Sequence, residues 1–328
     1  MSGKQPQIAQ IGCGYWGRNL ARNFAELGVL GAVVDGDPEV AERMSAATAA
    51  PVRSFDEVLA DPSIDGVALA TPAVSHASLA LRALASGKHV FVEKPLALDP
   101  ADARKVIAAA SAASRVLMVG HLLRYHPIFI ALQDLIGQGT LGQLRYVYSN
   151  RLSLGKFRTE EDVLWSFAPH DLSMVLALAD EVPDGVTAHG ASFVTPGIAD
   201  WCICQLDFPS GLAAHVQVSW AHPFKEQRLV VVGDQAMAVF EDSEPDWDRR
   251  LALYRHRIDR NGPVPVPEKA DAEYVSVPRS EPLRAECEHF LASIASGAAP
   301  RTDGEEGLRV LDVLDRAQRS LKVGIRTI

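Results

Sequence analysis

The chain has few cysteines and no cysteine pattern that indicates a cross-linked or metal-binding protein. Its 328 residues contain four cysteines, and none belongs to a Cys-x-x-Cys pair or a Cys/His cluster. These spacings exclude a disulfide framework and a zinc site, so we expect reduced thiols and no metal. The four residues are Cys13, Cys202, Cys204 and Cys287.

The sequence also lacks an excess of positive charge and a long apolar run. A net charge of −9 argues against general nucleic-acid binding. No apolar segment is long enough to span a bilayer, and the short, polar N-terminus MSGKQPQ predicts no signal peptide. We therefore expect a cytoplasmic protein with neither nucleic acid nor a membrane as its partner. The chain is long enough for two domains and a large core.

A glycine-rich turn lies between an expected strand and an expected helix near the N-terminus. In Gly12-x-Gly14-x-x-Gly17 the first glycine permits a tight turn, the second admits a pyrophosphate, and the third lets the helix pack closely. The helix start adds N–H groups and a positive dipole end. Asp35, at the end of the next strand, can bond ribose hydroxyls and repel a 2′-phosphate. This pattern predicts a Rossmann domain that prefers NAD to NADP.

Strands and helices alternate up to about Gly120, which favours a doubly wound parallel sheet. Asp99 followed by Pro100 predicts the start of one of these helices. The expected strands are Gln7–Ile11, Val29–Asp35, Gly66–Ala70, His89–Val92 and Leu117–Gly120.

Longer β-stretches follow, among them Leu212–Trp220, where apolar and polar residues alternate. Period two predicts one face packed on helices and a more polar face, which we expect to pair with a second subunit. Two helices are expected near residues 283–296 and 304–323. The predicted fold class is α/β, with an N-terminal Rossmann domain over residues 1–121. The C-terminal α/β domain, over residues 122–328, has a large, mostly antiparallel open sheet.

Glu93-Lys94-Pro95 follows the strand HVFV, and ligands of doubly wound sheets bind at such carboxyl ends. Desolvation and a neighbouring positively charged nicotinamide both disfavour the charged form of a lysine, so Lys94 can take part in proton transfer. A surface lysine in a loop is the alternative. Thr71-Pro72 and His76 follow another strand and either line the cofactor or cap a helix.

The second domain contains LWSFAPHDLSM, in which His170 lies near the expected start of a helix. His170 is either a proton-transfer group or a structural hydrogen-bonding residue. The segment SNRLSLGKFR supplies Asn150, Arg151 and Lys156, which suit phosphate or carboxylate or else form a solvated basic surface. The segment GHLLRYHP follows the last strand of the first domain.

Taken together, the segments GCGYWG, ATP…H, EKP and PHD, in this order, resemble the glucose–fructose oxidoreductase / inositol dehydrogenase / MocA (Gfo/Idh/MocA) family. The resemblance implies a Rossmann domain followed by an α/β domain whose open sheet forms a homodimer or homotetramer. It also implies that Lys94 and His170 flank the oxidised carbon and are the catalytic residues. Many members carry Asp or Asn four positions before this histidine, whereas this chain has Ser166, so a Lys–Asp–His triad does not transfer.

Within the family, GCGYWGRNLARNF, SNRLSLGKFR and SWAHPFKEQRLVVVG are similar to segments of bacterial nucleotide-sugar dehydrogenases. This likeness implies oxidation at C3 of a UDP-linked N-acetylated sugar, UDP-N-acetylglucosamine, for a subsequent aminotransferase. We predict these substrate-binding residues: Arg124, Tyr125, His126, Asn150, Arg151, Lys156 and His170. We predict these cofactor-binding residues: Gly12, Gly14, Tyr15, Trp16, Gly17, Asp35, Thr71, Pro72, His76, Glu93, Lys94 and Trp165.

Three alternatives remain open. The substrate is UDP-N-acetylglucosaminuronate, or it is a free sugar or inositol, which needs no cluster of basic residues. The third alternative is a non-catalytic NAD-binding regulator, and we expect such a protein to lack Lys94 or His170. Both residues are present.

Overall fold

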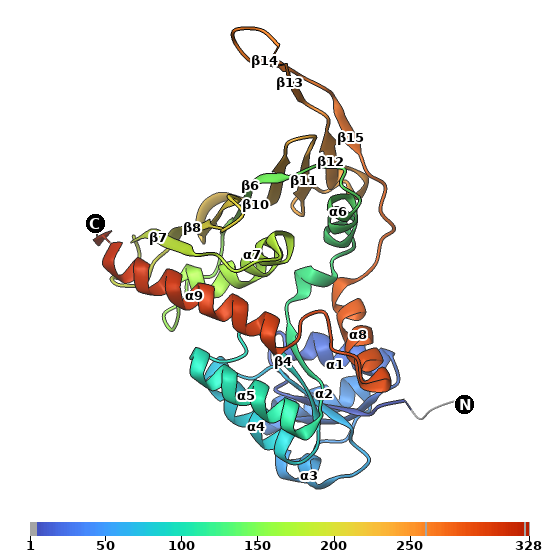
Figure 1. Cartoon of the computed structure of the whole chain (residues 1–328). Coiled ribbons are helices and arrows are strands. Elements are labelled where there is room, and N and C mark those ends of the chain that lie inside the picture. Colours follow the sequence, from blue (N-terminus) through green and yellow to red (C-terminus); the bar gives the residue numbers. More distant parts are fainter. Residues whose placement is uncertain (1–4, 260, 325, 328) are drawn as a thin grey trace. The chain divides into compact units, whose positions relative to one another are not determined.

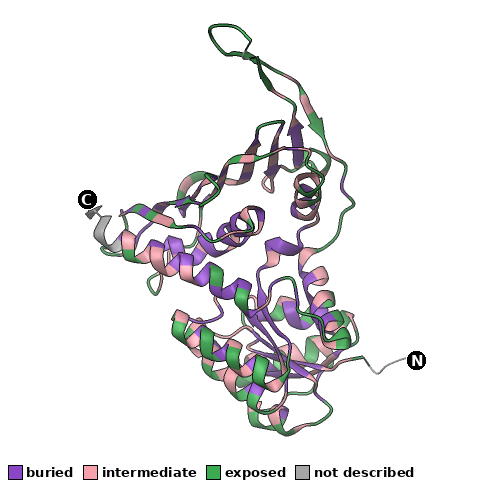
Figure 2. Cartoon of the chain, viewed as in Figure 1, coloured by how far each residue is buried: buried purple, intermediate pink, exposed green. Residues whose placement is uncertain are grey.

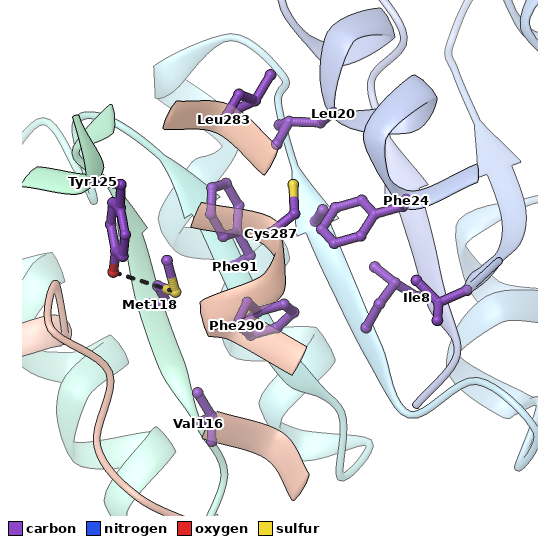
Figure 3. Packing of buried hydrophobic residues seen from close by; sticks show 12 residues of the cluster. Ile8, Leu20, Phe24, Phe91, Val116, Met118, Tyr125, Leu283, Cys287 and Phe290 are labelled. Carbon is purple, nitrogen blue, oxygen red and sulfur yellow. Dashed lines mark hydrogen bonds between the residues drawn. The ribbon is translucent and has the colours of Figure 1, made fainter. Parts of the chain in front are cut away.

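The computed structural model describes residues 5–259, 261–324 and 326–327, and the chain divides into two compact units. Unit 1 comprises residues 1–125 and 281–311, and unit 2 comprises residues 126–280 and 312–328. This division differs from the single predicted boundary between residues 121 and 122. The physical reason is that Leu283, Cys287 and Phe290, although far along the sequence from residues 1–125, pack into the core of unit 1 (Figure 3).

Among the described residues, unit 1 has a five-stranded parallel sheet in the order β2-β1-β3-β4-β5, as the alternating pattern predicted (Figure 1). The order changes direction at β1, so the ends of β1 and β3 form a topological switch point. The strands are β1 (Ile8–Ile11), β2 (Leu30–Val34), β3 (Gly66–Leu69), β4 (His89–Glu93) and β5 (Leu117–Gly120).

Several helices of unit 1 begin at side-chain caps. Asp99 accepts a hydrogen bond from the backbone N–H of Ala101, and Pro100 is the first helical residue, which confirms the predicted start. The helices are α1 (Gly17–Glu26), α2 (Pro38–Thr48), α3 (Phe55–Ala60), α4 (His76–Ala85), α5 (Pro100–Ala113), α8 (Pro282–Ser296) and the beginning of α9 (Gly304–Gly324), with short 3-10 turns η1 (Ala73–Ser75) and η2 (Leu122–Tyr125).

The core of unit 1 joins the sheet to helices α1 and α8. Leu20 and Phe24 of α1 and Phe290 of α8 lie in one buried cluster with Ile8 and Phe91 of the sheet (Figure 3). The rings of Phe91 and Phe290 meet edge to face with centroids 5.8 Å apart. Such burial of aromatic and aliphatic side chains is the main stabilising contribution to the fold.

Unit 2 is built on a nine-stranded sheet, counted over the residues that the structure describes, in the order β15-β12-β11-β10-β6-β9-β8-β7-β16. Only the β6–β9 and β7–β16 pairs are parallel within that part, so the predicted mostly antiparallel sheet is confirmed. The strands are β6 (Leu144–Leu154), β7 (Gly185–Ser192), β8 (Trp201–Asp207), β9 (Ala213–Ser219), β10 (Ala221–Gly233), β11 (Met237–Glu241), β12 (Leu251–Tyr254), β15 (Ala272–Tyr274) and β16 (Arg326–Thr327).

Strand β9 shows the predicted alternation up to Val218, whereas Ser219, which the alternation places on the polar face, is buried. Ala214, Val216 and Val218 are buried, whereas His215 and Gln217 are partly exposed. Figure 2 shows that the strands of the parallel sheet of unit 1 are mostly buried. Helix α7 (Val163–Ala179) packs against β6, β8 and β9. Unit 2 also contains α6 (Pro127–Gly137), the end of α9, the 3-10 turn η3 (Trp247–Arg249) and a small two-stranded sheet of β13 (Arg257–Asp259) and β14 (Val266–Glu268).

Candidate active site

A cavity of about 390 Å³ lies at the carboxyl ends of β1, β2 and β3 in unit 1. It is therefore at the topological switch point, where doubly wound sheets bind their ligands. Three short segments line it, one from each strand end: Ile11, Gly12 and Gly14; Val34, Asp35 and Gly36; and Ala70, Thr71 and Pro72. The sequence predicted five of these residues as cofactor-binding.

The three glycines of the turn meet different local requirements. Gly12 has a φ of +82°, and a Cβ there would lie 2.7 Å from the carbonyl oxygen of Ala70. A Cβ on Gly17 would lie 1.9 Å from the carbonyl oxygen of Gly12. Gly14 has no atom within 4 Å of the Cβ position, so its backbone borders open space at the start of α1. This arrangement fits a pyrophosphate beside the N-terminus of a helix.

Asp35 is held in place by backbone donors on both sides. Its Oδ2 accepts a hydrogen bond from the N–H of Cys13 at 2.6 Å, and its Oδ1 accepts one from the N–H of Asp37 at 2.9 Å. The carboxylate thus has a fixed orientation in the cavity wall. A fixed carboxylate at this position suits two ribose hydroxyls and opposes a 2′-phosphate.

Asp35 is therefore expected to make the chain bind NAD at least about tenfold more tightly than NADP, a difference of about 1.4 kcal/mol. Calorimetric titration with both cofactors measures the ratio. Asp35→Asn keeps an acceptor for the N–H of Cys13 but loses the charge, so the ratio should fall in this variant. Equal affinity of the unmodified chain for NAD and NADP would show that Asp35 does not select between the two cofactors.

Of the two aromatic residues in the glycine turn, only Trp16 is engaged with the strand ends. Its indole Nε1–H donates a hydrogen bond to Oε1 of Glu93, at the end of β4. Tyr15 is 80% exposed, and the guanidinium of Arg18 lies 4.9 Å from its ring centroid. Trp16 therefore connects the glycine turn to the Glu93-Lys94-Pro95 segment.

Burial raises the pKa of the Glu93 carboxyl to about 7, although the bond from Trp16 and the charge of Lys94 act in the opposite direction. Lys94 follows β4 directly at the carboxyl edge of the sheet, as predicted. Thr71 lines the cavity, whereas His76 is 1% exposed and contacts backbone carbonyl oxygens instead.

The side chains of Arg124 and Tyr125 both contact polar side chains of unit 1. Arg124 donates a hydrogen bond to the buried carboxylate of Glu306, and the hydroxyl of Tyr125 is 3.0 Å from Oγ1 of Thr302. Both side chains are buried, at 7% and 3% exposure. We therefore leave these two residues out of the substrate site proposed below.

In unit 2, His170 lies in the middle of α7 rather than near its start. The helix begins at Val163 because Asp162 caps it, accepting a hydrogen bond from the N–H of Trp165 at 3.1 Å. Pro169 lies inside the helix, although proline typically marks a first turn, and this explains the wrong prediction of the helix start. Trp165 is in the first turn, and Ser166 is buried.

Asp171, the neighbour of His170, fixes α7 to strand β6. Its carboxylate accepts a hydrogen bond from Oγ of Ser149 at 2.6 Å and one from Nε of Arg151 at 2.6 Å. Asp171 is 1% exposed, so this ion pair is shielded from water. The carboxylate of Asp171 therefore holds α7 against β6.

The remaining predicted substrate residues do not share one surface. Asn150 and Arg151 are consecutive in β6 and point to opposite faces, because Arg151 reaches α7 whereas Asn150 bonds Glu226 of β10 at 2.8 Å. His126 is buried and caps α6, its Nδ1 accepting from the N–H of Ile128 at 3.2 Å. Lys156 is exposed between β6 and α7.

Sequence reasoning missed a buried carboxyl in α8. Glu286 is fully buried, and neither of its oxygens has a hydrogen-bond partner among the described residues. Burial raises its pKa well above the ordinary value, and the nearby charge of Glu93 raises it further. Helical periodicity could have found it, because Glu286 lies on the same face of α8 as Leu283 and Phe290, whereas the exposed Glu288 lies on the other face.

These carboxyls predict a pH dependence of stability. A raised pKa means that folding favours the protonated form, so this stabilisation is complete below pH 4.5 and is lost as the pH rises through about 7, the pKa of Glu93. Glu286→Gln cannot ionise, so its unfolding free energy should fall less steeply with pH than that of the unmodified chain. Its Tm at about pH 8.5 should be higher by about 2 °C or more.

Thermal unfolding over a pH series tests this expectation. The matched control is Glu288→Gln, which removes an exposed carboxylate from the same helix. If the Tm of Glu286→Gln and that of the unmodified chain change with pH in parallel, the carboxyl of Glu286 has the same pKa in the folded and unfolded states.

Over the part of the chain that is described, no group of three His, Cys, Asp or Glu side chains is placed to hold a metal ion. The four cysteines are free and buried, as expected for thiols. No helix in the same residues is both long and apolar enough to cross a membrane.

The comparison with known families agrees with this geometry. Residues 7–121 match the model of an oxidoreductase family with an NAD-binding Rossmann fold, and residues 129–239 match the model of the GFO/IDH/MocA C-terminal domain. The fold and the cavity thus define an NAD-binding oxidoreductase. The chain belongs to the Gfo/Idh/MocA family, as the resemblance of its motifs implied.

Two relatives and a solved structure illustrate the likeness. The UDP-N-acetylglucosamine 3-dehydrogenase of Acidithiobacillus ferrooxidans is 33% identical over 312 residues, 92% of each chain. The inositol 2-dehydrogenase of Rhizobium meliloti is 28% identical over 301 residues, 88% of each chain. A structure of the Acidithiobacillus enzyme superimposes with a TM-score of 0.85 at 28% identity, covering 97% of this chain and 98% of the other.

Proposed function

We propose that the chain oxidises the C3 hydroxyl of UDP-N-acetylglucosamine to the 3-keto sugar with NAD as the oxidant. The observation that carries this proposal is the likeness to a UDP-N-acetylglucosamine 3-dehydrogenase over 92% of both chains. The cavity with Gly14 and Asp35 supports the choice of oxidant. A 3-keto sugar is a substrate for an aminotransferase, which would consume the product.

Lys94 and His170 are the proposed proton-transfer residues. One takes the proton of the C3 hydroxyl, and the other holds the sugar oxygen as the carbonyl forms. Bound NAD supplies the hydride acceptor. Trp16 and Glu93 hold the segment that carries Lys94, and Asp171 holds the helix that carries His170. The site proposal rests on motif position and family membership together with these local supports.

The proposed diphosphate-binding residue is Lys156, and Arg151 is a second candidate although it bonds Asp171 within unit 2. Arg151 retains a partly exposed side chain (11%) beside Asp171, and Lys156 is exposed on the connection between β6 and α7. Arg124, Tyr125, His126 and Asn150 are each bonded within their own unit, so we no longer assign them to the substrate.

A substrate panel tests this function. Formation of NADH is followed by absorbance with UDP-N-acetylglucosamine, UDP-N-acetylglucosaminuronate, free N-acetylglucosamine and inositol. We expect turnover with the first sugar, and its loss when the UDP group is absent. Inositol is included because of the 28% identity to inositol 2-dehydrogenase. Turnover of inositol alone would reject the nucleotide-sugar proposal and support this second function.

We further propose a cytoplasmic homodimer or homotetramer that pairs through the polar face of the large sheet. Tyr148 and His215 stack on that face with ring centroids 5.4 Å apart, and Gln217 lies in the next outward position of β9. Light scattering at micromolar concentration is expected to give two or four times the chain mass. Gln217→Arg should weaken this assembly by bringing like charges together across a symmetric interface. A monomer in both proteins would disprove the pairing.

A further inference from the structure

His76 is the first residue of α4 and lies inside unit 1 with 1% of its surface exposed. Both nitrogens of its ring contact backbone carbonyl oxygens. Nδ1 is 2.7 Å from the carbonyl oxygen of Pro95, and Nε2 is 2.8 Å from the carbonyl oxygen of Thr71. The ring therefore bridges two segments that are distant in sequence.

These two segments leave neighbouring strands at the same edge of the sheet. Thr71 follows β3 and lines the cofactor cavity, and Pro95 follows β4 and is the residue directly after Lys94. The bridge through His76 thus fixes the distance between the cavity wall and the backbone that carries Lys94.

The β3 side of the bridge is stiffened by its own hydrogen bonds. Oγ1 of Thr71 is 2.7 Å from Oγ of Ser75, and the Ser75 hydroxyl donates to the carbonyl oxygen of Pro72 at 2.7 Å. The β3 side can therefore act as the anchor, and the backbone after Lys94 is the part that His76 holds.

We infer that His76 is a positioning residue that orients Lys94 toward the cofactor cavity by holding the carbonyl of Pro95 against that of Thr71. This inference rests on the proposed role of Lys94. Carbonyl oxygens only accept hydrogen bonds, and burial lowers the pKa of His76, which favours a neutral ring with a single N–H. The ring therefore donates to one carbonyl oxygen and packs its other nitrogen edge against the second. A glutamine amide carries its donors on one nitrogen at the end of a flexible chain, so the substitution should keep one contact and release the other.

The test compares His76→Phe and His76→Gln with the unmodified chain. His76→Phe keeps an aromatic ring but removes both contacts, and we expect kcat to fall about tenfold or more through misplacement of Lys94. The affinity for NAD, measured by calorimetry, should change less than about threefold, because the glycine turn and Asp35 are untouched. His76→Gln should give an intermediate kcat.

His89→Phe is the matched control. The ring of His89 accepts a hydrogen bond from the N–H of Val116 at 3.0 Å at the opposite end of the same strand, β4. This control removes a contact between a histidine and the backbone without touching Thr71 or Pro95. The kcat of His89→Phe should stay within about twofold of the unmodified value, because the loss of this one hydrogen bond leaves Lys94 in place.

A second readout does not depend on turnover. The rate at which acetic anhydride labels Lys94, measured by mass spectrometry of the intact protein and its peptides, reports the surroundings of the amine. We expect it to change about threefold or more in both His76 variants and to remain constant in His89→Phe. An unchanged labelling rate in a folded His76 variant would overturn the inference.

The two proposals fail in distinguishable ways. If the unmodified chain oxidises none of the sugars, the proposed function fails, and the labelling rates still decide the role of His76. If a His76 variant loses stability but keeps both kcat and the labelling rate of Lys94, His76 serves the fold alone. If His76→Phe does not fold, the comparison is made with His76→Gln.

Discussion

Lys94→Met is expected to lower turnover by about a hundredfold or more, the usual effect of removing a general acid–base group. Methionine is unbranched and flexible and only one atom shorter than lysine, but it cannot carry a proton. The affinity for NAD should fall much less, because Gly12, Gly14 and Asp35 still line the cavity. Steady-state kinetics with UDP-N-acetylglucosamine and a separate NAD titration give the two numbers.

His170→Asn is expected to have an effect of similar size. Asparagine cannot accept a proton near neutral pH, whereas α7 stays fixed because Asp171 still binds Ser149 and Arg151. Ser166→Ala, one helical turn earlier, serves as the comparison, and it should matter less because serine carries no charge.

The kinetic outcomes separate three situations. Near-normal turnover in both Lys94→Met and His170→Asn would show that neither residue serves the reaction. Loss of NAD binding in Lys94→Met would indicate a structural defect, which thermal unfolding would detect. Near-total loss of turnover in Ser166→Ala would make this departure from the family pattern part of the proton path.

The glycine turn predicts a second large and separable effect. Gly17→Ala places a Cβ 1.9 Å from the backbone oxygen of Gly12, so α1 must move away from the turn. We expect a loss of about 3 kcal/mol or more in unfolding free energy. With an unfolding entropy of about 2.1 cal/mol/K per residue, that loss corresponds in a chain of 328 residues to a Tm lower by about 4 °C.

Gly14→Ala is the matched control, since nothing lies within 4 Å of the new Cβ. The variant should fold with an unchanged Tm, yet bind NAD about tenfold more weakly or worse, because the methyl group occupies space needed by the pyrophosphate. Equal Tm values for the two variants would contradict the packing described for Gly17. Full NAD affinity in Gly14→Ala would place the pyrophosphate elsewhere.

The features that sequence reasoning predicted correctly depend on residues close together in the chain. The glycine turn, the second strand with Asp35 and the Asp99-Pro100 helix start each lie within one or two neighbouring elements. The alternation in β9 is likewise local, because a strand turns successive side chains to opposite faces. Local geometry decides these features before the rest of the chain is placed.

The features that were missed depend on distant residues. From the sequence Arg124 is a cation available to a substrate, but in the structure it donates a hydrogen bond to Glu306, 182 residues later. In the sequence Asn150 and Arg151 belong to one candidate phosphate-binding segment, but in β6 their side chains point to opposite faces. The role of His76 could not be seen either, because both of its partners are backbone atoms, which carry no sequence signal.

The return of the chain to unit 1 at residues 281–311 limits how its gene can be divided. A fragment that stops after codon 125 encodes the whole parallel sheet but not α8, so the apolar surface of Leu20, Phe24 and Phe91 would face water. Such a truncated product is expected to aggregate, whereas joining residues 281–311 to it through a short designed linker restores the missing cover. Recombination that exchanges nucleotide-binding halves between relatives must likewise carry two separate stretches of coding sequence.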